Sequence, residues 1–236
     1  MTAEKLKEYF EQNPFDSLSK AVLYLLYTAI IRSELTPGTK INMSQLSSEL
    51  NISRSPIQDA CKELETIRFL EYVPEKKGYF VSTFKTIDMQ HVYDARKMFE
   101  SKAAFYCVQY HYFENLEQMA RLAEAFKSAF LSKNYVIISE LDIAFHELLV
   151  KSSHNPYLIK SYADMVKIWR RFSAFSHNFF EANPDNPYIN ALMYEHISIC
   201  NAIKTGIASL AETAVESHLD TVMNLSLLQR TEWSPF

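Results

Sequence analysis

The side chains best placed to do chemistry in this 236-residue chain are one aspartate and three histidines. Asp142 and His146 are four residues apart, so on a helix their side chains share one face. His196 and His218 follow, each among apolar neighbours. Three neutral imidazoles and one carboxylate that project into a helical bundle would suit a divalent transition metal. On spacing alone, a surface Asp–His pair remains the competing interpretation.

The donor set indicates which metal to expect. Zinc is expected first, and nickel, manganese and iron also suit imidazole and carboxylate donors. No two of the three cysteines are close in sequence, which excludes a thiolate zinc site and a disulfide framework. The other four histidines are expected to have no role: His91, His111, His154 and His177.

A second group of polar residues opens a short predicted helix in the N-terminal third. Arg54 could bind guanine with two hydrogen bonds, and Gln58 could read adenine. Serines at a helix N-terminus can hold a phosphate, and lysines of a nearby loop can contact the DNA backbone. Taken singly, each residue could be ordinary solvated surface. The predicted DNA-binding set is Ser44, Ser53, Arg54, Ser55, Gln58, Lys77 and Gly78.

These residues need elements to position them, and the pattern over residues 1–85 predicts a winged helix-turn-helix domain. Apolar residues three and four apart predict a helix over residues 17–32. Two short helices follow, one from Asn42 to Leu50 and one beginning at Ser53. Asn51 between them tolerates the left-handed conformation that a tight break requires. Two β-prone runs, residues 69–73 and 79–82, then predict a hairpin.

Residues 86–236 show helical periodicity throughout and predict an all-helical bundle, joined to the first domain by a linker near residues 84–87. The chain contains only three glycines, which argues against Gly-rich phosphate loops and turn-rich β folds. The fold class is therefore mainly α. The expected helices span residues 86–111, 114–131, 133–152, 156–178, 187–204 and 207–230.

Charge and hydropathy limit the functional classes. Residues 1–85 hold 11 basic and 11 acidic residues, and the rest of the chain holds 13 and 17. DNA binding must therefore depend on a local patch rather than on net charge. The polar N-terminus is not a signal peptide, and the longest apolar run is too short to cross a bilayer. We expect a cytoplasmic protein with no membrane contact.

The motifs of the first domain resemble the winged-helix domain of the GntR transcription regulators. The similar segments are Leu35-Thr36-Pro37-Gly38-Thr39-Lys40-Ile41, Leu46 to Ile57, and Gly78-Tyr79-Phe80-Val81. The resemblance implies that Arg54 contacts DNA and that Gly78 lies at the wing tip. The family usually has glycine at Asn51 and arginine at Gln58. The second departure suggests a different operator sequence, because glutamine prefers adenine to guanine.

Residues 88–228 resemble the all-helical effector (FCD) domain of the FadR subfamily of these regulators. The similarity includes the segment from Asp94 to Ala104, Asp142-x3-His146, Glu195-His196 and His218. The resemblance implies that a metal is held by Asp142, His146, His196 and His218. It also implies that Arg96 faces an effector pocket, with either Arg170 or, as we expect, Arg171 beside it.

Together these features predict a transcription regulator that is not an enzyme. A homodimer would bind a pseudo-palindromic double-stranded operator, and a small carboxylate bound at the metal would change its affinity. Repression released by the effector is the expectation from the family. Two alternatives remain: a metal-dependent hydrolase fused to a winged helix, and a regulator whose metal is purely structural.

Overall fold

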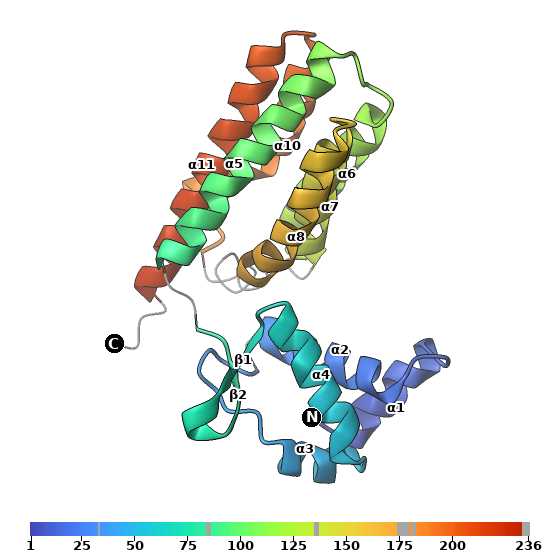
Figure 1. The fold of residues 1–236 in the computed structure, drawn as a ribbon. Coiled ribbons are helices and arrows are strands. Elements are labelled where there is room, and N and C mark those ends of the chain that lie inside the picture. The colour runs from blue at the N-terminus through green and yellow to red at the C-terminus, as the bar shows by residue number, and fades with distance from the viewer. Residues whose placement is uncertain (33, 84–85, 135–136, 174–179, 181–182, 233–236) are drawn as a thin grey trace. The chain divides into compact units, whose positions relative to one another are not determined.

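The chain folds into two compact units, Met1–Phe84 and Lys85–Phe236 (Figure 1). The computed structural model describes residues 1–236 except 33, 84–85, 135–136, 174–179, 181–182 and 233–236. Within helices, the side chains of residues 86–88, 167, 171–172 and 226–232 also lie outside the description. The expected linker near residues 84–87, the end of the helix expected over 156–178, and His177 fall wholly or partly among these residues.

The described residues of the first unit form four α-helices and a two-stranded sheet. Helices α2 and α4 pack together, and α3 lies against α4 as in a helix-turn-helix. Helix α1 was not predicted, because most of its residues are polar or charged and only Leu6 is buried. The elements are α1 (Ala3–Gln12), α2 (Leu18–Ile31), α3 (Met43–Leu50), α4 (Arg54–Thr66), β1 (Leu70–Val73), the 3-10 turn η1 (Pro74–Lys76) and β2 (Gly78–Val81).

The break between α3 and α4 has the predicted geometry. Asn51 adopts a left-handed conformation with φ of 52° and ends α3. Asn42 begins α3 and accepts a hydrogen bond from the Gln45 backbone N–H at 3.1 Å. Ser53 occupies the N-cap position of α4 but makes no side-chain capping bond, contrary to the sequence expectation. Its exposed hydroxyl group therefore does not stabilise the helix.

Strands β1 and β2 form the wing, an antiparallel hairpin in which Leu70 pairs with Val81 and Val73 with Gly78. The left-handed residue of the turn is Lys77, with φ of 46°, rather than the glycine that follows it. Gly78 lies against a neighbouring side chain. A Cβ atom there would lie 2.9 Å from Cε of Lys40, near the end of a flexible side chain that can move aside.

The second unit is a bundle of helices (Figure 1). The long helices α5 and α11 pack along each other, and ion pairs join Lys97 to Asp220 and Lys102 to Glu212. Helix α10 packs on α11, and α7 packs on α5, α6 and α8. The helices are α5 (Thr86–Gln109), α6 (Leu116–Leu131), α7 (Ile138–Lys151), α8 (Pro156–Ser173), α10 (Pro187–Lys204) and α11 (Ala208–Glu232).

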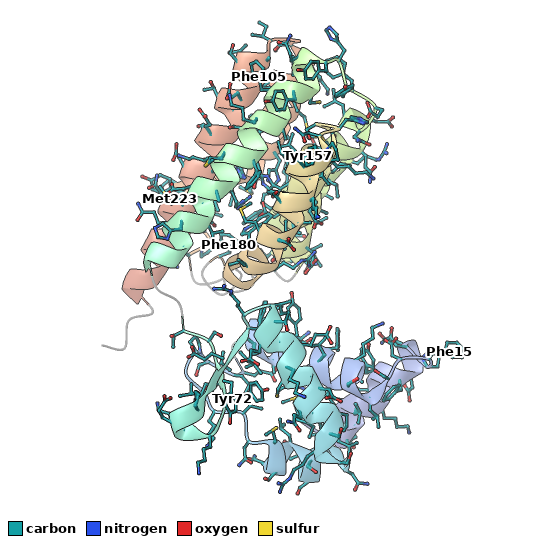
Figure 2. The ribbon with its side chains drawn as sticks, in the orientation of Figure 1. Phe15, Tyr72, Phe105, Tyr157, Phe180 and Met223 are labelled. Atoms are coloured by element: carbon teal, nitrogen blue, oxygen red, sulfur yellow. The ribbon has the colours of Figure 1, made fainter. Side chains whose placement is uncertain are left out.

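Aromatic side chains fill one end of this bundle. Phe130 packs against Phe126 and Phe180 with ring centroids 5.1 and 5.0 Å apart, and Figure 2 labels Phe180 within the unit. Burial of such rings is the main stabilising contribution in helix packing. The predicted fold class, a winged helix-turn-helix domain followed by an all-helical domain, is confirmed. Within the described part of the chain, no helix has the length and hydropathy to span a bilayer.

Candidate metal centre and DNA-binding surface

The four predicted ligands come together inside the helical unit. Asp142 and His146 lie one turn apart on α7, His196 lies on α10 and His218 on α11. One ligand atom from each residue falls within 4.8 Å of the others. Nε2 of His146 lies 3.0 Å from Nε2 of His218 and 3.1 Å from Nε2 of His196. Oδ1 of Asp142 lies 3.2 Å from the His196 nitrogen.

These separations suit a single ion. Ligand atoms about 2.1 Å from one metal lie roughly 3.0 Å apart at adjacent octahedral positions and about 3.4 Å apart in a tetrahedron. The distances from Asp142 to His196 and to His146, 3.2 and 3.5 Å, fall in the same range. The cluster therefore has the donor types and the spacing of a transition-metal site, and all four residues are buried.

Hydrogen positions strengthen this interpretation. Nδ1 of His146 lies 2.6 Å from Oε2 of Glu100, and Nδ1 of His218 lies 2.9 Å from Oε2 of Glu195. Burial opposes the ionisation of Glu100, but Arg96 and His146 outweigh it and lower its pKa to about 2. An ionised carboxylate only accepts hydrogen bonds, so the contact favours a hydrogen on Nδ1 of His146 and a lone pair on its Nε2. Burial raises the pKa of Glu195 to about 7, and its ionised form favours the same arrangement at His218. With both Nε2 atoms unprotonated, their lone pairs would face each other at 3.0 Å, a contact that a metal ion or a shared hydrogen relieves. The outer carboxylates thus prepare both rings for a metal.

Burial sets the charge of the cluster. It lowers the pKa of His196 to about 4, despite the opposing effect of Asp142. Burial, together with the neighbouring imidazoles, also lowers the pKa of His218 well below its ordinary value. Burial opposes the ionisation of Asp142, but the adjacent rings of His146 and His196 outweigh it and lower the carboxyl pKa. At His146 burial also opposes protonation, but the Glu100 carboxylate outweighs it and raises the pKa of the ring. Two of the three imidazoles are therefore held neutral beside an ionised carboxylate, the states in which these residues bind metals, and a metal must displace any proton on His146.

Arg96 lies next to this cluster and is fully buried. Its Nε donates to Oε1 of Glu100 at 2.6 Å, and its guanidinium stacks 3.5 Å from the ring centre of Trp169. Trp169 in turn contacts His146 edge-on, with centroids 5.5 Å apart. Nη1 of Arg96 is buried and has no hydrogen-bond partner among the described residues. A buried donor without a partner is costly, so this atom is a candidate to bind an anionic ligand.

The second predicted effector arginine is not placed by the structure. Arg171 belongs to α8, but its side chain lies outside the described residues. Arg170 is part-exposed and donates from Nη1 to both oxygens of Glu140, at 3.2 and 2.9 Å. The assignment of Arg171 to the pocket therefore stays a prediction.

Sequence reasoning gave no role to two residues that contact the metal ligands, Glu100 and Glu195. The Tyr162 hydroxyl donates to Oε1 of Glu100 at 2.8 Å, and the Thr221 hydroxyl donates to Oε1 of Glu195 at 2.7 Å. One signal was available in the sequence, because Glu100 follows Arg96 by four residues and must share its helix face. No spacing rule connects Glu195 with His218, since their contact joins two helices.

All the predicted DNA-contacting residues except Gly78 are exposed on the winged-helix unit. Arg54, Ser55 and Gln58 are all exposed in the first turns of α4, the second helix of the helix-turn-helix, with Ser53 at its N-cap. This is the position from which a recognition helix reads base edges. Ser44 is exposed at the start of α3. The role of each residue toward DNA stays a prediction.

Lys40 extends the wing and was not predicted. Its Nζ donates to the Lys76 carbonyl at 3.0 Å and lies 5.8 Å from the centre of the Phe80 ring. The backbone of residues 38–41 also bonds along β2, as in the 2.8 Å bond from Ile41 N–H to the Tyr79 carbonyl. Gly78 is buried beneath this side chain, whereas Lys77 is exposed. The cationic wing tip therefore includes Lys40, Lys76 and Lys77.

These features define a class of protein: a winged-helix protein whose second, helical domain contains a buried site of metal-ligand type. Comparison with known families gives the same result. Residues 18–81 match the family of bacterial regulatory proteins called gntR, and residues 91–221 match the FCD domain. The chain therefore belongs to the GntR family of DNA-binding transcription regulators and carries an FCD effector domain.

Relatives support this assignment. An uncharacterised HTH-type transcriptional regulator, YdhC of Bacillus subtilis, is 30% identical over 130 residues, which cover 55% of this chain and 58% of that protein. The gluconate operon transcriptional repressor of Bacillus licheniformis is 23% identical over 195 residues, covering 82% of this chain and 78% of the repressor. The solved structure of Escherichia coli McbR/YncC has the same fold, with a TM-score of 0.69 and 18% identity. That match covers 92% of this chain and all of McbR/YncC.

Proposed function

We propose that this regulator senses a small carboxylate at a metal held by Asp142, His146, His196 and His218. The observation that carries the proposal is the convergence of these four buried side chains, one ligand atom each within 4.8 Å. Such a metal, zinc first among the candidates, would supply a Lewis-acid centre for an anionic oxygen. Arg96 supports an anionic ligand, because its Nη1 is a buried donor without a partner among the described residues.

The DNA-binding half of the proposal rests on the exposed start of α4 and on the wing. Arg54 and Gln58 would read bases in the major groove, while Lys77 would contact phosphates. Two copies of the chain would bind the two halves of a pseudo-palindromic operator. The effector would act by preferring one arrangement of the dimer. A preference of about 1.4 kcal/mol changes operator affinity roughly tenfold.

The first experiment is metal content per chain, measured by elemental analysis on protein purified without chelator or metal-affinity tag. About one metal per wild-type chain and almost none in His196→Ala would support the ligand assignment. No metal in either protein, even after zinc, nickel or manganese is supplied, would rule it out.

The second experiment tests the sensor. Operator fragments selected from random DNA by the metal-loaded protein are titrated by fluorescence anisotropy, with and without small carboxylates. Gluconate belongs in the panel, because relatives are described as gluconate operon repressors. An affinity that changes with a carboxylate in wild type but not in Arg96→Met supports the proposal. A metal that no carboxylate perturbs would instead indicate a structural role.

The hydrolase alternative is tested with the same protein. Metal-loaded wild type is incubated with ester and amide substrates, and turnover is compared with that of His196→Ala. A hydrolase also needs a general base and an oxyanion donor placed around the substrate. We assign neither from the described residues, so we expect no metal-dependent turnover.

A further inference from the structure

We propose that Glu100 is a positioning residue that serves the metal ligand His146 and the effector arginine Arg96 at once. Through this double contact it would couple metal binding to anion binding. The inference rests on the function proposed above and deepens it, because it names the side chain through which the two ligands influence each other.

Glu100 has an unusual number of partners for a buried carboxylate. Its side chain is completely buried on α5. Oε1 accepts from Nε of Arg96 at 2.6 Å and from the Tyr162 hydroxyl at 2.8 Å. Oε2 lies 2.6 Å from Nδ1 of His146 and 3.4 Å from Nη2 of Arg96. Oε1 therefore accepts from two donors, Oε2 lies close to two further nitrogens, and each oxygen contacts Arg96.

These contacts set the tautomer of His146 and the orientation of the Arg96 guanidinium. The contact with Oε2 keeps a hydrogen on Nδ1 of His146, so that the Nε2 lone pair points toward Asp142, His196 and His218. The contacts with Arg96 hold its guanidinium flat against Trp169, at 3.5 Å from the ring centre. Of the three guanidinium nitrogens, Nη1 is thereby left for an incoming anion.

Glu195 provides the contrast that makes the proposal specific. It orients His218 in the same way, at 2.9 Å, but its second oxygen accepts from the neutral Thr221 hydroxyl rather than from a cation. Nδ1 of His196 has no hydrogen-bond partner among the described residues. Of the two outer carboxylates, only Glu100 is bonded to Arg96.

The direction of the coupling follows from charge. An anion bound to Arg96 neutralises part of the guanidinium charge, which leaves Glu100 a stronger acceptor for the His146 N–H. A stronger acceptor makes the imidazole a better electron donor to the metal. Anion binding should therefore tighten metal binding, and by reciprocity the metal should tighten anion binding.

The test begins with zinc affinity. Chelator competition is run on metal-free, full-length wild type, Glu100→Gln, Glu195→Gln and Tyr162→Phe. A glutamine at position 100 cannot accept on both sides, so its amide group must face either Arg96 or Nδ1 of His146. We expect both glutamine variants to bind zinc about 10- to 100-fold more weakly than wild type. Tyr162→Phe is the matched control, because it removes a buried donor to the same carboxylate yet leaves that carboxylate in place. It should change zinc affinity by less than about threefold.

Acetate then serves as the anion probe for the coupling. Zinc affinity is measured with and without acetate, with the chelator calibrated in each buffer. We expect acetate to raise zinc affinity in wild type and in Glu195→Gln by a similar factor. In Glu100→Gln that factor should be at least threefold smaller. Equal factors in the two glutamine variants would overturn the coupling, and wild-type zinc affinity in Glu100→Gln would overturn the positioning role.

Two further measurements separate positioning from folding. If Glu100→Gln alone fails to fold, the double variant Arg96→Met/Glu100→Gln takes its place, because it leaves no unpaired charge in the interior. It should still bind zinc at least tenfold more weakly than wild type. In ¹⁵N spectra of zinc-loaded protein, the downfield Nδ1–H signal of His146 should persist in Tyr162→Phe and disappear in Glu100→Gln. Wild type that binds no metal would refute the proposed function itself, whereas tight binding unaffected by Glu100→Gln would refute the inference alone.

Discussion

Replacement of Arg96 by methionine removes a charge from the interior while keeping most of the side-chain volume. Arg96 and Glu100 both have side chains with 0% exposure and are joined by a 2.6 Å hydrogen bond. Methionine can occupy the space of the arginine stem and pack on Trp169, so the cavity left behind is small. The main effect is therefore electrostatic, because Glu100 keeps its charge and loses its cation.

The structure sets the size of this effect. Removing one partner of a buried ion pair costs about 3–5 kcal/mol. Glu100 keeps two donors, the Tyr162 hydroxyl at 2.8 Å and Nδ1 of His146 at 2.6 Å. In the metal-free protein His146 can take up a proton and offset part of the loss. We therefore expect Arg96→Met to lower the free energy of unfolding of the helical unit by about 3 kcal/mol, the lower end of this range.

Urea unfolding followed by tryptophan fluorescence measures this value. Both tryptophans, Trp169 and Trp233, belong to residues 85–236, so the signal reports on the helical unit and not on the winged helix. Metal-free wild type, Arg96→Met and Arg96→Met/Glu100→Gln are compared. The double variant should be more stable than the single variant by at least about 1 kcal/mol, because it leaves no unpaired carboxylate.

Two results would refute this reasoning. A loss below about 1 kcal/mol in Arg96→Met would mean that Glu100 is solvated or protonated in the folded protein. A double variant less stable than Arg96→Met would mean that Glu100 stabilises the bundle without its arginine. In either case the buried pair would not have the energetic role assigned to it.

The remaining predictions concern the metal and the DNA. Free zinc at 100 times its Kd should stabilise the wild type by about 2.7 kcal/mol and so raise its thermal unfolding temperature. His196→Ala should abolish this rise, and an unchanged rise would exclude His196 as a ligand. Arg54→Ala should abolish specific operator binding in an anisotropy assay while the circular dichroism spectrum stays the same, and retained specificity would argue against α4 as the reading helix. Lys40→Met should weaken binding to all DNA sequences about equally. It should also reduce the slope of log affinity against log salt concentration by about 1 for each wing that contacts DNA. A loss of affinity that depends on the DNA sequence would contradict a phosphate contact by Lys40 at the wing tip.

The sequence predicted the elements whose signals are local. Asn51 was expected to be left-handed between two short helices, and it has φ of 52°. The hairpin followed from two β-prone runs separated by a loop, and the strands pair over Leu70–Val73 and Gly78–Val81. Helix α1 was not predicted although Leu6, Tyr9 and Phe10 have helical spacing, because the segment is short and most of its residues are polar or charged.

The site was predictable only in part. Asp142 and His146 could be paired by their helical spacing, but the meeting of α7, α10 and α11 needed the resemblance to the family. The wing glycine shows a similar limit, because its contact is with Lys40, 38 positions earlier in the chain. Glu195 was named within the similar pattern but given no role for the same reason, since His218 approaches it from another helix at 2.9 Å. Contacts between distant segments leave no spacing signal in a single sequence.

The buried polar residues of the helical unit favour a binding role over a purely structural one. Arg96, Glu100, His146, His196 and His218 all have 0% exposure, and each loses hydration when the bundle forms. Well-packed apolar residues of similar volume often give equal or greater stability than buried ion pairs. A domain that served only to hold two copies together would gain little from this network. A binding role explains the network. A metal at the Nε2 atoms of the three histidines and an anion at Nη1 of Arg96 would replace the interactions with water that burial removed.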